Sequence, residues 1–171
     1  MPSLCLLRHA KSDWSDPTLA DFDRPLNRRG RKAAPLLGRY LRKQALLPDL
    51  VLCSAAQRAR ETWERVAAQL KGEVPVKVLR SLYLAPPSRI LGILQRQAPE
   101  VERLLVIGHN PGMENLAIQL AGSGDPKTRA RMREKFPTAA LAVLDFDGRG
   151  WEGLSPGGAR LARFVLPRDL A

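Results

Sequence analysis

Residues 3–10 read SLCLLRHA, an apolar run that ends abruptly in Arg8 and His9. A short run of Leu and other apolar residues, bounded by polar ones, is typical of a buried β-strand. The only other histidine among the 171 residues, His109, directly follows a second run of this kind, RLLVIG at 103–108. The two runs predict two strands of one buried sheet, each followed by a histidine.

The rest of the chain alternates between apolar runs and segments with helical spacing. Further buried strands are predicted at 49–53, 74–79 and 140–146, with a sixth candidate at 159–166. Helices are predicted at 31–45, 55–70, 87–97, 112–121 and 126–135. Pro35 is tolerated only near a helix start or at a kink, so we expect the first helix to begin late. The alternation predicts an α/β fold, a three-layer sandwich with a mostly parallel central sheet and helices on both faces.

Length and composition indicate one globular domain. Hydrophobic residues make up 44% of the chain and charged residues 26%, as is usual for soluble proteins. The Gly- and Pro-rich stretch 147–158 is interpreted as a connection between two late strands, so we predict a single domain over 1–171. No apolar stretch approaches the roughly twenty residues of a membrane span, and the N-terminus lacks the charged start of a signal peptide. We therefore expect no membrane association and a cytoplasmic location.

The two cysteines give no sign of a metal site. Cys5 lies in one apolar run and Cys53 ends another, and neither belongs to a C-x-x-C pair or a His/Cys cluster. Two histidines without thiolates or an Asp/Glu cluster also fall short of a usual ligand set. We expect buried, reduced thiols and no bound metal.

The charge of the chain is strongly basic. There are 28 Lys and Arg against 17 Asp and Glu, which gives a net charge of +11 and attracts anionic partners. Residues 24–43 hold eight basic residues and no acidic one. Four basic residues are interpreted either as solvated surface or as cations that steer acidic or phosphorylated partners: Lys11, Arg24, Arg28 and Arg29. Nucleic acid is a less favoured partner, because the chain has no recognisable reading motif and no aromatic array for stacking bases.

Four polar side chains follow three of the predicted strands. Arg8 and His9 follow the first, Arg58 opens the helix after 49–53, and His109 follows 103–108. Because ligands of such sheets bind beyond the carboxyl ends of the strands, we expect the four to converge. Guanidinium groups offer planar sets of donors that match phosphate oxygens, and imidazole can act as a nucleophile. Together they predict a phosphate clamp around a histidine nucleophile, although each residue alone is more often a satisfied polar group or a solvated charge.

Four segments carry a resemblance to a known family. They are LLRHAKSDW (6–14), FDRPLNRRGRKAA (22–34), LCSAAQRARET (52–62) and VIGHNPG (106–112). In this order they resemble the motifs of the histidine phosphatase superfamily, the phosphoglycerate-mutase-like group. Within it, the sequence is similar to the small bacterial phosphohistidine phosphatases of the SixA type. The resemblance implies the phosphoglycerate-mutase-like fold.

The resemblance also implies a role for each matched residue. His9 would attack phosphorus and become phosphohistidine, Arg8 and Arg58 would bind the phosphoryl oxygens, and His109 would complete the pocket. Water would then hydrolyse the phosphoenzyme, so neither a metal nor an organic cofactor is needed. Asn27 stands where the family usually has Thr or Ser, and its side-chain oxygen can still cap the following helix.

One departure from the family bears on the substrate. Many ester-cleaving members carry an acidic residue after the third strand, but no carboxylate lies between Glu73 and Glu100. An alkoxide leaving group needs a proton, whereas an imidazole that leaves from a P–N bond can already be protonated on its other nitrogen. The missing acid favours phosphohistidine over a phosphate ester. Another loop could still supply a proton, from Asp13, Asp21 or Glu114.

The sequence thus predicts a metal-independent phosphatase that hydrolyses phosphohistidine, on a protein, through a phosphohistidine enzyme intermediate. A chain this short has little room for insertions over the pocket, so we expect an open site that admits a histidine of another protein. Two alternatives stay open. One is a phosphomonoesterase that acts on a small phosphorylated metabolite, and the other is a non-enzymatic binder of nucleic acid or phosphoprotein.

Overall fold

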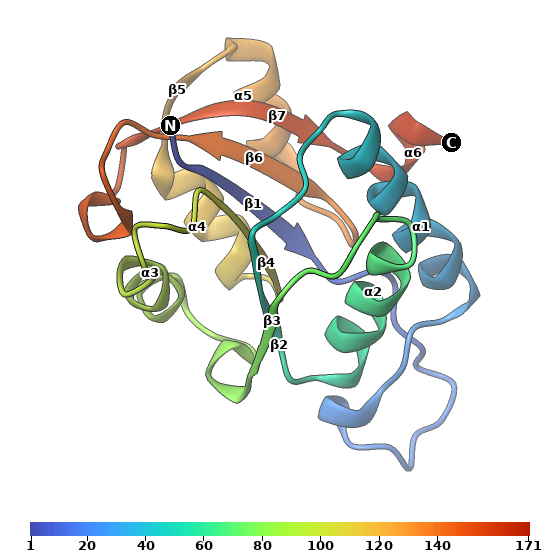
Figure 1. The fold of residues 1–171 in the computed structure, drawn as a ribbon. Helices are drawn as coiled ribbons and strands as arrows, with labels where there is room; N and C mark the ends of the chain where they lie inside the picture. Colours follow the sequence, from blue (N-terminus) through green and yellow to red (C-terminus); the bar gives the residue numbers. More distant parts are fainter.

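The computed structural model describes all of residues 1–171 and centres on a seven-stranded sheet (Figure 1). Its strands are β1 (Ser3–Arg8), β2 (Leu50–Ser54), β3 (Val76–Leu79), β4 (Arg103–Gly108), β5 (Ala121–Gly124), β6 (Leu141–Asp145) and β7 (Ala159–Val165). Their order in the sheet is β3-β2-β4-β1-β6-β7-β5. Only β6 runs against the others, because it pairs antiparallel with both β1 and β7 while every other neighbouring pair is parallel. The predicted mostly parallel sheet is confirmed.

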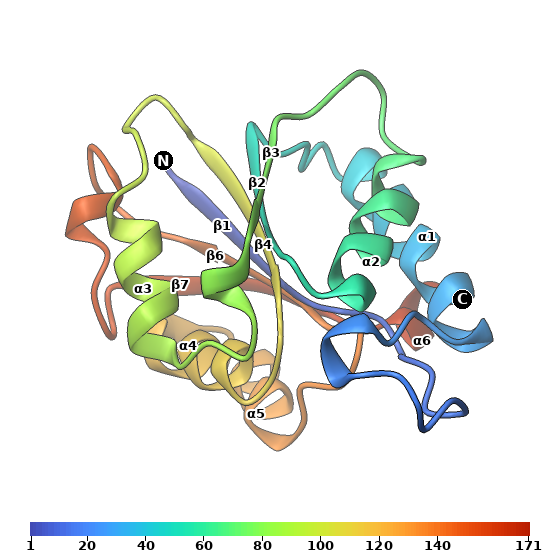
Figure 2. The same ribbon diagram turned by 90° about the horizontal axis from the view of Figure 1, so that it is seen from below.

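Helices cover both faces of this sheet. They are α1 (Arg28–Lys43), α2 (Gln57–Ala67), α3 (Pro87–Gln95), α4 (Gly112–Leu120), α5 (Pro126–Glu134) and α6 (Pro167–Leu170). Both views place α1, α2 and α6 on one face and α3, α4 and α5 on the other (Figures 1 and 2). Successive side chains of β1 alternate between the two buried clusters, Leu4 and Leu6 in one, Cys5 and Leu7 in the other. The predicted three-layer sandwich is confirmed.

Helix α1 begins earlier than its proline suggests. Asn27 caps it as expected, since its Oδ1 accepts a hydrogen bond from Gly30 N at 2.9 Å, and the helix runs from Arg28 through Pro35 without ending. The expected late start is wrong. Pro35 removes one hydrogen bond inside the helix, but the apolar face with Leu37 and Leu41 is fully buried, and this packing stabilises the helix.

Glycine at position 30 brings α1 against the segment that follows β1. A Cβ at Gly30 would overlap the backbone carbonyl oxygen of Lys11, so a larger residue would push the two segments apart. A hydrogen bond holds the same two segments together, since Asn27 N donates to that carbonyl oxygen of Lys11 at 2.9 Å. The start of α1 therefore fixes the backbone two residues after His9.

Two strands differ from the sequence prediction. The strand predicted at 74–79 was expected to be buried, but β3 is an edge strand whose Val76 and Val78 are 40% and 49% exposed. Strand β5 was not predicted, because its sequence AGSG has no alternation and no β-branched residue; it pairs with β7 at the other edge. The stretch 147–158 does connect β6 and β7. None of the helices has the length and apolar character needed to cross a lipid bilayer.

Candidate active site

The two histidines lie side by side at the carboxyl edge of the sheet. Strands β1 and β4 are adjacent and parallel, with Arg8 paired to Gly108, so the residues that follow them emerge together. The ring centroids of His9 and His109 are 5.1 Å apart. Arg8 and Arg58 line the same pocket, which has a volume of 290 Å³. The four side chains converge on one pocket, as predicted.

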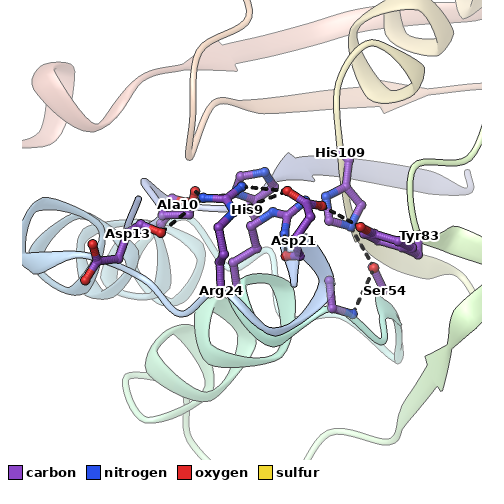
Figure 3. A network of polar contacts seen from close by, with 11 residues as sticks. His9, Ala10, Asp13, Asp21, Arg24, Ser54, Tyr83 and His109 are labelled. Carbon is purple, nitrogen blue, oxygen red and sulfur yellow. Dashed lines mark hydrogen bonds and ion pairs between the residues drawn. The ribbon is translucent and has the colours of Figure 1, made fainter. Parts of the chain in front are cut away.

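His9 is held with one ring nitrogen occupied and the other free. The side chain is buried, and its Nδ1 lies 2.7 Å from the carbonyl oxygen of Ala10 (Figure 3). A carbonyl can only accept, so Nδ1 carries the proton and Nε2 keeps its lone pair. Burial, and after it the positive charges near the ring, lower the pKa of His9 to about 3, against the hydrogen bond to Ala10. The ring is therefore neutral near pH 7.

The turn after His9 is fixed to α2. Ala10 N donates to Oγ1 of the buried Thr62 at 3.0 Å, and that hydroxyl donates to the carbonyl oxygen of Arg58 at 2.7 Å. Thr62 and Arg58 are one helical turn apart on α2. A single hydroxyl thus joins the backbone next to His9 to the helix that presents Arg58.

His109 makes its hydrogen bond through Nε2, the ring nitrogen that is free in His9. Its Nε2 lies 2.7 Å from Oγ of Ser54, at the end of β2, and Ala56 N donates to the same Oγ at 3.3 Å (Figure 3). Because Ala56 N already donates to this hydroxyl oxygen, we assign the serine proton to the contact with Nε2, and this assignment leaves the ring proton on Nδ1. Burial, followed by the charge of Arg58, lowers the pKa of His109 to about 3. His109 therefore presents a neutral N–H donor.

Unpartnered donors concentrate at this site. Arg8 Nη1 donates to the carbonyl oxygen of Phe136 at 3.2 Å, and Arg58 donates from Nη1 and Nη2 to Asp21 at 2.7 and 3.0 Å. Four buried side-chain polar atoms lack a partner in the whole chain, and three of them are Nε of Arg8, Nε of Arg58 and Nδ1 of His109. Leaving a buried donor unpaired costs about 1–3 kcal/mol. Three such donors around His9 form a site suited to an oxyanion.

One carboxylate lines the pocket, and it is held as an anion. Asp21 accepts hydrogen bonds from the Tyr83 hydroxyl, from Arg58 and from Arg24 (Figure 3). Burial alone would raise the pKa of Asp21, but these three donors lower it to about 2. The other two candidate proton donors, Asp13 and Glu114, are not among the lining residues.

The loop between β1 and α1 is held together by Arg24. This side chain is only 6% exposed and donates to Ser12 Oγ at 2.7 Å, to the Asp13 carbonyl at 3.2 Å and to Asp21 at 3.0 Å. Its guanidinium carbon lies 3.4 Å from the centroid of the Trp14 ring. The interpretation of Arg24 as solvated surface is therefore wrong, and its role as a steering cation stays a prediction. Trp14, 69% exposed, borders the pocket.

Two groups of the site were not found from the sequence. Tyr83, in the short turn after β3, packs edge-on against His109 with centroids 5.4 Å apart and donates to Asp21. The Phe136 carbonyl accepts from Arg8 and also from Asn110 Nδ2 at 2.8 Å. A single tyrosine has no characteristic spacing in the sequence that would mark it as part of a site. A backbone carbonyl group is present at every residue, so the sequence cannot mark it either.

The cysteines are both buried, as expected, and burial raises the pKa of each thiol to about 12. No three His, Cys, Asp or Glu side chains lie together in an arrangement that could hold a metal ion.

Comparison with known proteins places this chain in a family. Residues 4–83 match the histidine phosphatase superfamily, branch 1. An uncharacterised protein of Mycobacterium tuberculosis is 42% identical over 164 residues, which cover 95% of this chain and 100% of that one. A crystal structure from Agrobacterium tumefaciens, described as a candidate phosphohistidine phosphatase SixA, is 32% identical with a TM-score of 0.83 and covers 98% of this chain and 99% of that one. The protein histidine phosphatase SixA in complex with tungstate is 25% identical with a TM-score of 0.79 and covers 99% of both chains.

The chain belongs to the histidine phosphatase superfamily, as its paired histidines and arginines at the sheet edge indicate. Within that superfamily the similarity extends over nearly the whole length of the SixA structures, so the fold and the sequence are those of the SixA type.

Proposed function

We propose that this protein is a metal-independent phosphatase that removes the phosphoryl group from phosphohistidine on another protein, through a covalent intermediate at His9. The observation that carries the proposal is the set of three unpartnered, buried N–H groups on Arg8, Arg58 and His109, around a neutral histidine with a free Nε2. We place this activity in the cytoplasm.

The reaction has two displacements. First, His9 Nε2 forms a bond to phosphorus as the P–N bond of the substrate breaks, and the substrate imidazole leaves with a proton on its other nitrogen. Donors from Arg8, Arg58 and His109 hold the phosphoryl oxygens and stabilise their charge. Water then forms a bond to phosphorus as the bond to His9 breaks, which releases phosphate and restores the free imidazole.

The state of Asp21 supports the choice of phosphohistidine over an ester. Its pKa of about 2 keeps the carboxylate ionised at neutral pH, so it has no proton to give to an alkoxide. An imidazole leaving group needs no such proton. The SixA relatives whose structures are known are themselves described as phosphohistidine or protein histidine phosphatases.

The surroundings of the pocket support a protein substrate. Trp14 and Leu84 line the pocket and are 69% and 54% exposed, so its rim is accessible from solvent. A histidine on the surface of a partner can approach His9 without the opening of a lid.

The test is phosphate release from a phosphohistidine peptide and from an aryl phosphate ester, both with EDTA present. We expect fast release from the peptide alone, lost in His9→Ala. Faster release from the ester would replace the proposal with a phosphomonoesterase, and loss of activity with EDTA would overturn metal independence. Release that survives His9→Ala would overturn the mechanism.

A matched variant tests the role of Asp21. If Asp21 donated a proton, Asp21→Asn would slow ester hydrolysis much more than phosphohistidine hydrolysis. We expect both rates to change by a similar factor, because the carboxylate only positions Arg58 and Tyr83. Asp13→Asn, in the same loop but outside the pocket, is the control.

A further inference from the structure

A second hollow adjoins the proposed active site. It has a volume of 390 Å³, larger than the 290 Å³ of the pocket that holds the histidines, and Lys11 and Thr138 line both. Its walls come from the start of α1, the end of α5 with the segment that follows, and α6. Helices α1 and α6 lie side by side in both ribbon views (Figures 1 and 2). We call this hollow the basic groove.

The basic groove is dominated by unpaired cations. Its charged lining consists of Lys11, Arg29, Arg131, Lys135 and Arg168, against the single acid Glu134. Arg131 is paired with Asp169 at 2.7 Å, but the other four make no ion pair and no side-chain hydrogen bond, and all four are exposed. Like charges gathered in one hollow raise the local potential and attract an anion.

One short segment forms a wall of both the pocket and the basic groove. Pro137 and Thr138 line the groove. On either side of them, the Phe136 carbonyl accepts from Arg8 at 3.2 Å, and Ala139 N donates to the carbonyl oxygen of His9 at 3.0 Å. A chain that lies in the groove therefore passes next to the residues that would hold the phosphoryl group.

We infer that the basic groove binds an acidic segment of the protein substrate, next to the phosphohistidine that enters the pocket. This inference rests on the proposed function and names the kind of partner it acts on. The cations come from three helices and from the segments after β1 and α5, so they can meet several carboxylates along a chain. No aromatic side chain lines the groove, so it lacks the surfaces on which nucleic-acid bases stack.

The test compares two double variants that remove the same charge. Lys135→Ala/Arg168→Ala removes two groove cations that do not line the histidine pocket, and Lys71→Ala/Lys77→Ala removes two exposed cations on and before β3. The substrates are a phosphohistidine peptide with acidic flanks, the same peptide with neutral flanks, and phosphoramidate.

We expect the groove variant to lower kcat/KM for the acidic peptide by about 5- to 10-fold, through KM, since each exposed charge makes only a small contribution to binding. Its activity on the neutral peptide and on phosphoramidate stays at the wild-type level, and the β3 variant changes none of the three by more than about twofold. Equal turnover of both peptides by the wild type, or equal losses in both variants, would overturn the inference.

A binding measurement separates this inference from the proposed function. Fluorescence anisotropy of a labelled acidic peptide without phosphate reports on the groove even if phosphohistidine is not hydrolysed. Weaker binding in the groove variant alone supports the inference. Unchanged binding contradicts it, and so does tighter binding of a single-stranded oligonucleotide that is lost in the same variant.

Discussion

His9 and His109 occupy equivalent places after two neighbouring parallel strands, and yet opposite nitrogens of their rings are engaged. Nδ1 of His9 faces the Ala10 carbonyl, whereas Nε2 of His109 faces the Ser54 hydroxyl. Both rings are buried and both have a pKa of about 3. The difference between them therefore lies in which nitrogen keeps its proton, and not in their charge.

This difference divides the chemistry between two identical side chains. A carbonyl acceptor leaves His9 with a lone pair, which a nucleophile needs. A hydroxyl that donates to Nε2 leaves His109 with an N–H, which binds an oxyanion. In the proposed mechanism, a neighbouring backbone or side-chain group selects the tautomer and thereby the role.

The largest expected effect comes from removing each ring in turn. We expect His9→Ala to lower phosphate release by about 10⁴-fold or more and to prevent any phosphoenzyme. His109→Ala removes one donor, so we expect a loss of about 10²- to 10³-fold, with the phosphoenzyme still formed. Rapid-quench labelling with a phosphoramidate measures both, and thermal denaturation checks that each variant is folded. A covalent label on the His9→Ala protein would reverse the two roles.

A smaller effect is expected from Ser54→Ala. The change removes the donor to His109 Nε2, so the ring can place its proton on either nitrogen, and loss of an orienting group of this kind costs about 10-fold. Nitrogen NMR of the histidine rings reports the tautomer directly. Full activity with the proton still on Nδ1 would show that Ser54 does not position the ring.

The last expected effect concerns stability, and not turnover, as the pH falls. A histidine with a folded-state pKa of about 3 stays neutral while the unfolded chain takes up protons below its ordinary pKa of about 6.5. The free energy of unfolding therefore falls on acidification, by about 1.4 kcal/mol per pH unit for each ring between roughly pH 6 and 4.5. Urea denaturation at several pH values measures this slope, and the His9→Ala/His109→Ala protein should lose it. A slope that persists in that protein would assign it to other groups.

The histidines and arginines of the site could be predicted because strands bring them together. Each follows an apolar run, and parallel strands end at one edge, so position along the chain is enough to place Arg8, His9, Arg58 and His109. Loop residues do not follow this rule. Asp21 and Tyr83 meet across 62 positions of sequence, and Arg24 is buried only because one loop folds around it.

The contrast between residues placed by local sequence and residues placed by distant contacts also explains the errors in the predicted fold. The Asn27 cap marks the start of α1, and burial of the face with Leu37 and Leu41 stabilises the helix, although the local preference of Pro35 opposes a helix there. The exposure of β3 and the pairing of β5 depend on which strand lies at each edge, and a run of residues read by itself does not contain that information.

The burial of Cys5 and Cys53 has a consequence for redox tolerance. With a pKa of about 12 and almost no exposed surface, neither thiol forms the thiolate that peroxide and alkylating reagents attack. The proposed nucleophile is a nitrogen, which these oxidants do not convert to a sulfenic acid. Phosphoryl transfer at this site would therefore continue under oxidative stress that inactivates a phosphatase whose nucleophile is a reactive cysteine.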